Sequence, residues 1–199
     1  MRYVAGRTDI IDPEINSPEW DKASEGYIDK EQWSGFAPIP NTEFKILRGP
    51  EGISVRMHTD EKNLKAVYTE KNSMVCRDSC MEFFFKPDPW SLKYFNFEFN
   101  PLGTAYIAVG SDRYDREKYE GERDIFSIVS QAQDGDWTVK FYIPDEFVYR
   151  YCKNINHVIR ANLYKCGDET DHQHYGMWAP VEVLKPDFHV PDFFGKIEL

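Results

Sequence analysis

Two aromatic runs between Cys76 and Asn100 constrain the fold of this chain more than any other stretch. The first is Met-Glu-Phe-Phe-Phe at residues 81–85, and the second is Tyr-Phe-Asn-Phe-Glu-Phe at residues 94–99. Both are rich in aromatic residues and neither shows the 3.6-residue spacing of an amphipathic helix. They therefore predict two neighbouring strands of an antiparallel sheet.

Strand geometry sorts the side chains of both runs onto two faces, because successive residues of a strand point to opposite sides. The predicted core face carries Met81, Phe83, Phe85, Phe95, Phe97 and Phe99. Glu82 lies on the other face beside Glu98, among amides and a tyrosine. Antiparallel sheets usually expose one face to water, so this polar face is interpreted either as a solvated surface or as a ligand-binding surface.

Short strands bounded by turns continue along the rest of the chain. They are expected over residues 43–47, 53–58, 64–68, 104–109, 125–131, 137–143 and 158–164. Helix is expected only as one turn after Ser17 and over residues 144–151, and the charged segment 111–123 is expected to be a loop. This pattern predicts an all-β fold, an antiparallel two-sheet β-sandwich of jelly-roll type. A chain of 199 residues suits a single domain over residues 1–199.

Charge and hydropathy restrict the partners of the chain. The formal net charge is -10, which argues against a nucleic-acid partner because phosphate binding needs clustered Lys and Arg. No stretch is long and apolar enough to span a membrane, and the N-terminal residues contain no signal-peptide run. A complete chain is therefore expected to be cytoplasmic with reduced cysteines, whereas a domain excised from a secreted precursor is expected to be extracellular.

A second polar strand face is expected over residues 158–164, where Arg160, Asn162 and Tyr164 alternate with apolar residues. If this strand neighbours the aromatic runs, Arg160 and Asn162 converge with Glu82, Asn96 and Glu98 on one sheet surface. Carboxylates, amides and a guanidinium fork match the vicinal hydroxyls of a sugar, each of which donates and accepts. The pattern therefore indicates saccharide binding.

Two other classes of function remain open at this point. Paired carboxylates act as acid and base in glycoside hydrolysis, so Glu82 and Glu98 allow a saccharide-acting enzyme. However, no Gly-x-Ser-x-Gly, phosphate loop, His-Glu-x-x-His or dinucleotide-binding motif occurs, which favours a protein without catalytic activity. Met74, Met177 and several histidines allow a haem-binding sandwich.

Four ordered motifs resemble the family 9 carbohydrate-binding modules, most closely the family-9-like branch of stand-alone bacterial proteins. The motifs are Arg-Asp-Ser-Cys-Met-Glu-Phe-Phe at 77–84, Tyr-Phe-Asn-Phe-Glu-Phe-Asn-Pro-Leu-Gly at 94–103, Arg-Ala-Asn-Leu-Tyr-Lys-Cys-Gly-Asp at 160–168, and Trp178 with Pro-Asp-Phe-Phe-Gly at 191–195. The resemblance implies a non-catalytic β-sandwich that binds saccharides. The xylanase-linked members of that family stack the terminal sugar between two aromatic rings and also hold structural calcium. It assigns the acidic residue of the binding motif to Glu82 and a binding tryptophan to Trp178.

The chain departs from the xylanase-linked members of that family at two points. Cys76 and Arg77 stand where those members carry a tryptophan, and no arginine occurs between residues 94 and 100. Arg77 or Arg160 is expected to replace the missing arginine. A related sandwich that has lost sugar binding and serves as an interaction domain is therefore an alternative.

Together these observations predict a non-enzymatic carbohydrate-binding protein whose partner is a saccharide or glycan. The predicted ligand-binding residues are Glu82, Trp178, Arg77, Asn96, Glu98, Arg160, Asn162 and Tyr175. Structural calcium is predicted from the resemblance and from the acidic excess, without assigned ligands.

Overall fold

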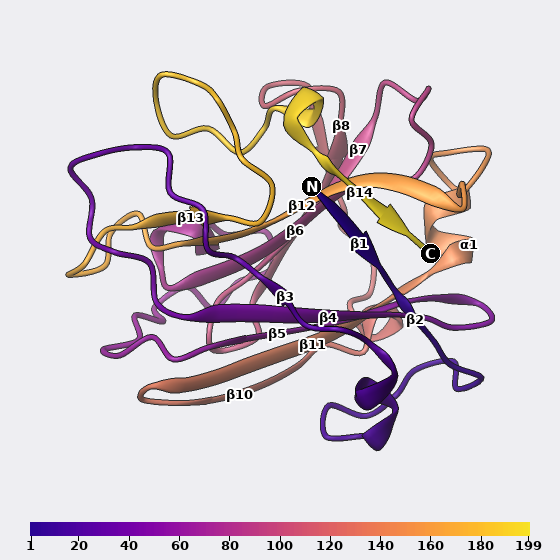
Figure 1. Ribbon diagram of the computed structural model, residues 1–199, viewed down its shortest axis with the longest axis horizontal. Helices are drawn as coiled ribbons and strands as arrows, with labels where there is room; N and C mark the ends of the chain where they lie inside the picture. Colours follow the sequence, from indigo (N-terminus) through magenta and orange to yellow (C-terminus); the bar gives the residue numbers. More distant parts are fainter.

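Two sheets face each other in the computed structural model, which describes residues 1–199 (Figure 1). The first sheet contains, in spatial order, β1 (Arg2–Val4), β14 (Gly195–Glu198), β12 (Val158–Cys166), β6 (Cys80–Lys86), β7 (Tyr94–Phe99), β8 (Ala105–Gly110) and β9 (Arg116–Lys118), with β13 (Tyr175–Met177) paired to β12. The second contains β10 (Val129–Gln133), β11 (Asp136–Pro144), β5 (Gly52–Thr59), β4 (Thr42–Arg48) and β2 (Gly6–Arg7), with β3 (Gly26–Tyr27) paired to β4. The predicted all-β sandwich is confirmed, and its strands are antiparallel except for the pairs β1–β14 and β2–β4.

Helix is confined to short segments, as expected. The one α-helix is α1 (Asp145–Tyr149), and four 3-10 turns span Pro18–Lys22, Val75–Arg77, Asp124–Phe126 and Pro191–Phe193. The Ser17 side chain accepts a hydrogen bond from the Glu19 amide at the start of the first turn, as its position before a proline predicts. No helix of the structure is long and apolar enough to cross a membrane.

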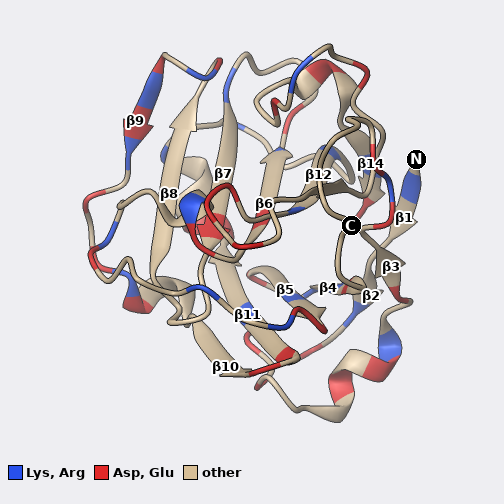
Figure 2. Cartoon of the chain, turned by 90° about the vertical axis from the view of Figure 1, so that its left-hand side faces the viewer, with Lys and Arg blue, Asp and Glu red and all other residues tan.

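Three of the predicted segments differ from the structure. The strand expected over residues 125–131 begins only at Val129, because the chain first makes the 3-10 turn Asp124–Phe126. No strand forms over residues 64–68, because the amides of Val67 and Tyr68 donate to Asp78 Oδ2, at 2.9 and 3.0 Å, and not to a partner strand. The segment 111–123, expected to be a loop, contains the short strand β9. Arg116 is in register with Gly110 of β8, and the alternating charges of β9 mark the edge of the sheet (Figure 2).

The space between the sheets holds the predicted aromatic core. The inward-facing residues of β6 and β7 are all fully buried: Met81, Phe83, Phe85, Phe95, Phe97 and Phe99. Phe97 stacks on Phe141 of the opposite sheet with ring centres 5.7 Å apart. The alternation of the two aromatic runs therefore identified the core face correctly.

The opposite face of β6, β7 and β12 is covered by protein, not by water. Tyr164 and Phe84 on this face are fully buried beneath residues 179–194, and Phe188 stacks on Tyr164 with ring centres 4.0 Å apart. This C-terminal cover is the yellow segment over β12 and β13 in Figure 1. A fully solvated surface is therefore the wrong interpretation of the polar face, which lies between the sheet and a covering loop.

Candidate ligand-binding site

A cavity of about 300 Å³ lies where the C-terminal cover leaves this face open. Its lining carries four acidic residues (Glu82, Glu98, Asp168 and Asp187), two arginines (Arg113 and Arg116) and three aromatic rings (Tyr106, Tyr175 and Phe188), together with Met74, Cys76, Cys166, Pro186 and His189. This volume is at the lower end of the range found for small-molecule sites in proteins. The lining residues come from strands β6 to β9, β12 and β13, and from two loops, one before β9 and one after residue 183.

Two paired carboxyl groups form the floor of the cavity. Glu82 and Glu98 are directly opposite each other on β6 and β7, at 3% and 6% exposure. Burial raises the pKa of Glu98 to about 7, and burial together with the neighbouring Glu98 charge raises the pKa of Glu82 well above its usual range. The pair therefore does not carry two full negative charges near neutral pH.

Each of these carboxyl groups uses one oxygen within the protein. Glu98 Oε1 accepts a hydrogen bond from Asn96 Nδ2 at 2.6 Å, and Glu82 Oε1 accepts one from the Cys166 thiol at 3.1 Å. The second oxygen of each carboxyl group makes no hydrogen bond to protein. Two carboxyl oxygens are therefore available to hydrogen-bond a ligand at the cavity floor.

Two arginines from the segment expected to be a loop reach the cavity. Arg116 Nη1 donates to Tyr94 Oη at 2.7 Å, whereas its Nε and Nη2 are buried without a partner. Arg113 forms an ion pair with Asp187 at 3.1 Å, which connects the loop before β9 to the C-terminal cover. Burial and the two arginines lower the pKa of His189 to about 3, so this ring is neutral. In the sequence, only the short run Arg-Glu-Lys at residues 116–118 indicates strand β9, which carries Arg116.

Two tyrosines stand at opposite ends of the cavity floor. Tyr106 of β8 is directly opposite Glu98, and Tyr175 of β13 is in register with Cys166. Because cross-strand partners point to the same face, both rings stand on the side of the sheet that carries the carboxyl groups. Phe36 and Trp33 pack edge-on against Tyr175, with ring centres 4.8 and 6.1 Å away. Sequence analysis did not single out Tyr106, since its position is set only by the register of β7 and β8.

The structure separates the predicted binding residues into two groups. Glu82, Glu98 and Tyr175 line the cavity. Asn96 lies beneath it, fully buried, and holds Glu98. Asn96, which lies on the same strand β7, therefore holds the Glu98 side chain in position.

Three other predicted residues lie outside the cavity. Asn162 is fully buried and holds the C-terminal cover, because its amide donates to Ala179 O and accepts from Ala179 N, both at 2.8 Å. Arg77 is half-exposed beside Glu169. Arg160 approaches Asp192 O at 3.4 Å. Arg113 and Arg116, not these two arginines, supply the guanidinium groups of the cavity.

Trp178 requires a correction. Its side chain is 3% exposed and packs edge-on against Phe44 and Tyr3 within the core, with ring centres 5.8 and 6.5 Å away. The ring thus presents no face to a ligand, and the predicted stacking role is wrong. The physical reason is that Trp178 follows β13, where the chain passes over the edge of the sandwich and the indole enters the space between the sheets.

Comparison with known proteins places this arrangement in a family. The model of "Carbohydrate-binding family 9" matches residues 18–199. The chain belongs to this family. The family 9 chain also superposes with a TM-score of 0.87 on a Bacteroides uniformis protein described as a "putative carbohydrate-binding protein", at 23% identity over 99% of this chain and 98% of the other.

More distant structures show the same fold. A family 9 module from Caldicellulosiruptor kristjanssonii was solved in complex with glucose and with cellotriose. Both structures match with a TM-score of 0.64 at 12% identity, over 100% of this chain and 95% and 93% of the others. No curated protein matches this family 9 chain in sequence.

The fold brings together few side chains that could hold a metal ion or a haem group. One group of three metal-ligating side chains occurs, Cys80, Glu82 and Cys166. Calcium prefers six to eight oxygen ligands, so a group with two sulfurs does not fit it, and calcium stays a prediction. Met177 is fully buried with its sulfur 3.1 Å from the Val181 amide, so it does not face the cavity as a haem ligand would.

Proposed function

We propose that this family 9 protein binds a saccharide, without catalysis, in the cavity above Glu82 and Glu98. The observation that carries the proposal is the set of hydrogen-bonding groups left without protein partners there. The free oxygen of each carboxyl group accepts when the group is ionised and can donate when it is protonated, and the guanidinium groups of Arg113 and Arg116 line the same cavity. Vicinal sugar hydroxyls both donate and accept, so one ring can satisfy both kinds of group.

The rings of Tyr106 and Tyr175 supply the apolar contacts in this proposal. A sugar ring presents C–H groups on its faces, and an aromatic side chain offers a rigid surface for them at low cost in conformational entropy. These tyrosines take the place of the tryptophan that is missing at Cys76. Family membership, and the glucose and cellotriose held by the related modules, support a saccharide as the ligand.

The charge of the lining favours a neutral saccharide. Four acidic side chains face two arginines, of which Arg113 is already paired with Asp187. A phosphorylated or carboxylated sugar would add negative charge beside the floor carboxyl groups, which is unfavourable in a partly buried site.

The position of the two carboxyl groups favours binding over hydrolysis. Glycoside hydrolases place their two carboxyl groups on either side of the scissile bond. Glu82 and Glu98 instead stand side by side on one floor and point in the same direction. A saccharide above them contacts both from the same side.

Calorimetric titration of the metal-free protein with glucose, cellotriose and glucuronic acid tests this proposal. We expect the neutral sugars to bind in preference to the acid, with no hydrolysis products. Glu98→Gln keeps the shape of the side chain and removes its charge, so it should weaken binding by about 1 to 3 kcal/mol, or roughly 5- to 150-fold.

Glu146→Gln on α1 is the matched control, because that side chain is 87% exposed and lies outside the cavity. It should leave the affinity unchanged. A folded parent protein that binds none of these sugars, nor any glycan of a broad array, would overturn the proposal. Hydrolysis that Glu98→Gln abolishes would make the protein an enzyme.

A further inference from the structure

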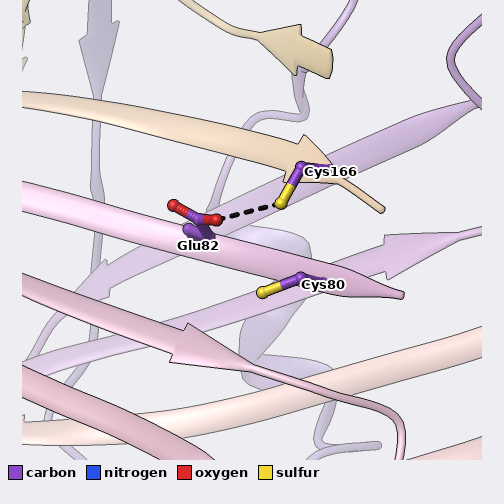
Figure 3. Close-up of side chains that lie close together, drawn as sticks. All are labelled: Cys80, Glu82 and Cys166. Atoms are coloured by element: carbon purple, nitrogen blue, oxygen red, sulfur yellow. Dashed lines mark hydrogen bonds between the residues drawn. The ribbon is translucent and has the colours of Figure 1, made fainter. Parts of the chain in front are cut away.

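Three metal-ligating side chains meet at one corner of the cavity floor, where β6 begins and β12 ends. Cys80 and Cys166 are directly opposite each other on these antiparallel strands, and Glu82 follows on the same face of β6. Their ligand atoms all lie within 4.8 Å of one another, and Cys166 Sγ is 3.1 Å from Glu82 Oε1 (Figure 3). The two cysteines are 0% and 1% exposed, and both are free thiols.

The spacing of these atoms is close to that of a tetrahedral zinc site. Zinc–sulfur bonds of about 2.3 Å and zinc–oxygen bonds of about 2.1 Å place two sulfurs about 3.8 Å apart and a sulfur and an oxygen about 3.6 Å apart. The observed upper limit of 4.8 Å exceeds these separations by about 1 Å. Small side-chain rotations are enough to close that difference.

Electrostatics also points to a cation at this position. Glu82 has no ion-pair partner among the lysine, arginine and histidine side chains, although it is 3% exposed and faces a second buried carboxyl group. An ionised Glu82 carboxylate is unfavourable at this position without a compensating charge, and a divalent cation supplies that charge when the carboxyl group loses its proton. The two sulfurs favour a soft ion over calcium or magnesium.

We propose that Cys80, Glu82 and Cys166 bind one thiophilic divalent cation, for which Zn²⁺ has the best-matched ligand preferences. Cys166 and Glu82 also line the cavity, so the ion has an entry path and its fourth position faces the cavity, where water completes the tetrahedron. Binding displaces to solvent the protons of the two thiols and the proton of the Glu82 carboxyl group where that group is protonated. The metal site goes beyond the proposed saccharide binding, and it shares Glu82 and Cys166 with the lining of the saccharide cavity.

Cobalt substitution tests the proposal on the reduced, chelator-treated protein without any saccharide. One Co²⁺ per chain should give the thiolate charge-transfer absorption and the visible bands of tetrahedral cobalt, and one equivalent of Zn²⁺ should abolish both. Removal of a residue that only hydrogen-bonds to a metal ligand typically lowers metal affinity about 10- to 100-fold. Cys166→Ser removes a ligand itself, so it should lower the affinity for Co²⁺ by at least about 100-fold. Glu82→Gln should weaken binding while keeping the charge-transfer absorption at saturation.

Cys152→Ser is the matched control, since it removes a buried thiol that lies outside the cluster. It should bind Co²⁺ as the parent does. A folded, reduced parent without charge-transfer absorption would overturn the proposal even if the cysteine variants fail to fold. Equal weakening by Cys152→Ser would overturn it as well. Saccharide binding is measured on metal-free protein with the Glu98→Gln variant, whereas metal binding is measured without any saccharide. A negative result in one experiment therefore overturns only the proposal that it tests.

Discussion

Replacement of Trp178 by alanine separates a core role from a binding role for this residue. The indole is 3% exposed, contacts the edges of two aromatic rings and approaches Gly195 so closely that a Cβ there would lie 2.6 Å from it. Tryptophan-to-alanine changes in well-packed cores cost about 3 to 5 kcal/mol. The close packing leaves little room for the site to collapse, so we expect a value in the upper half of that range.

This loss has a direct thermal signature. For a chain of this size, 1 kcal/mol corresponds to about 2 to 4 °C, so a loss of about 4 to 5 kcal/mol in Trp178→Ala should lower Tm by roughly 8 to 20 °C. Calorimetric melting and guanidinium unfolding of the same samples measure the change. At temperatures where the variant is folded, its sugar affinity should stay near that of the parent, because Trp178 does not line the cavity.

Trp90→Ala is the control, because Trp90 is 90% exposed. It should change the unfolding free energy by no more than about 0.5 kcal/mol. If Trp178→Ala melts with the parent and binds sugar at least tenfold more weakly, the tryptophan is a stacking residue and its assignment to the core is wrong.

Three further predictions concern stability. Burial, and next the charge of Lys165, lower the pKa of His174 to about 4. The contribution of His174 to stability should therefore fall as pH drops from about 6.5 toward 4, by about 2 kcal/mol at pH 5. Urea midpoints at pH 7 and pH 5 should show a smaller loss for His174→Gln, and an identical loss would refute this assignment. Gly195→Ala should destabilise by about 1 to 3 kcal/mol because the new methyl group meets the Trp178 ring, and a neutral melting point would contradict it. If structural calcium is present, EDTA should lower Tm and added calcium restore it, whereas an unchanged Tm would count against calcium.

The burial of the carboxyl pair explains why the polar face suits a ligand and not bulk water. The C-terminal cover stacks Phe188 on Tyr164 and is pinned by the Asn162–Ala179 hydrogen bonds. These contacts remove solvent from most of the face and leave one opening above Glu82 and Glu98. Hydrogen bonds to a ligand are stronger in such a partly desolvated site than on an open sheet surface.

The sequence by itself determined the sandwich and the two carboxyl groups at its candidate site. Strand alternation has a period of two residues, so the local order of Phe83, Phe97, Glu82 and Glu98 already assigns each side chain to a face. The short turns, such as the one at residues 134–136, likewise carry their own signals in neighbouring residues.

Only the tertiary structure decided what lies against each face. Alternation cannot show that Trp178 enters the core, that Arg116 extends the sheet as β9, or that Cys80 meets Cys166 across two strands. Each of these outcomes depends on contacts between segments far apart in the chain. Their free energy comes from the packing of whole layers, and no window of neighbouring residues contains it.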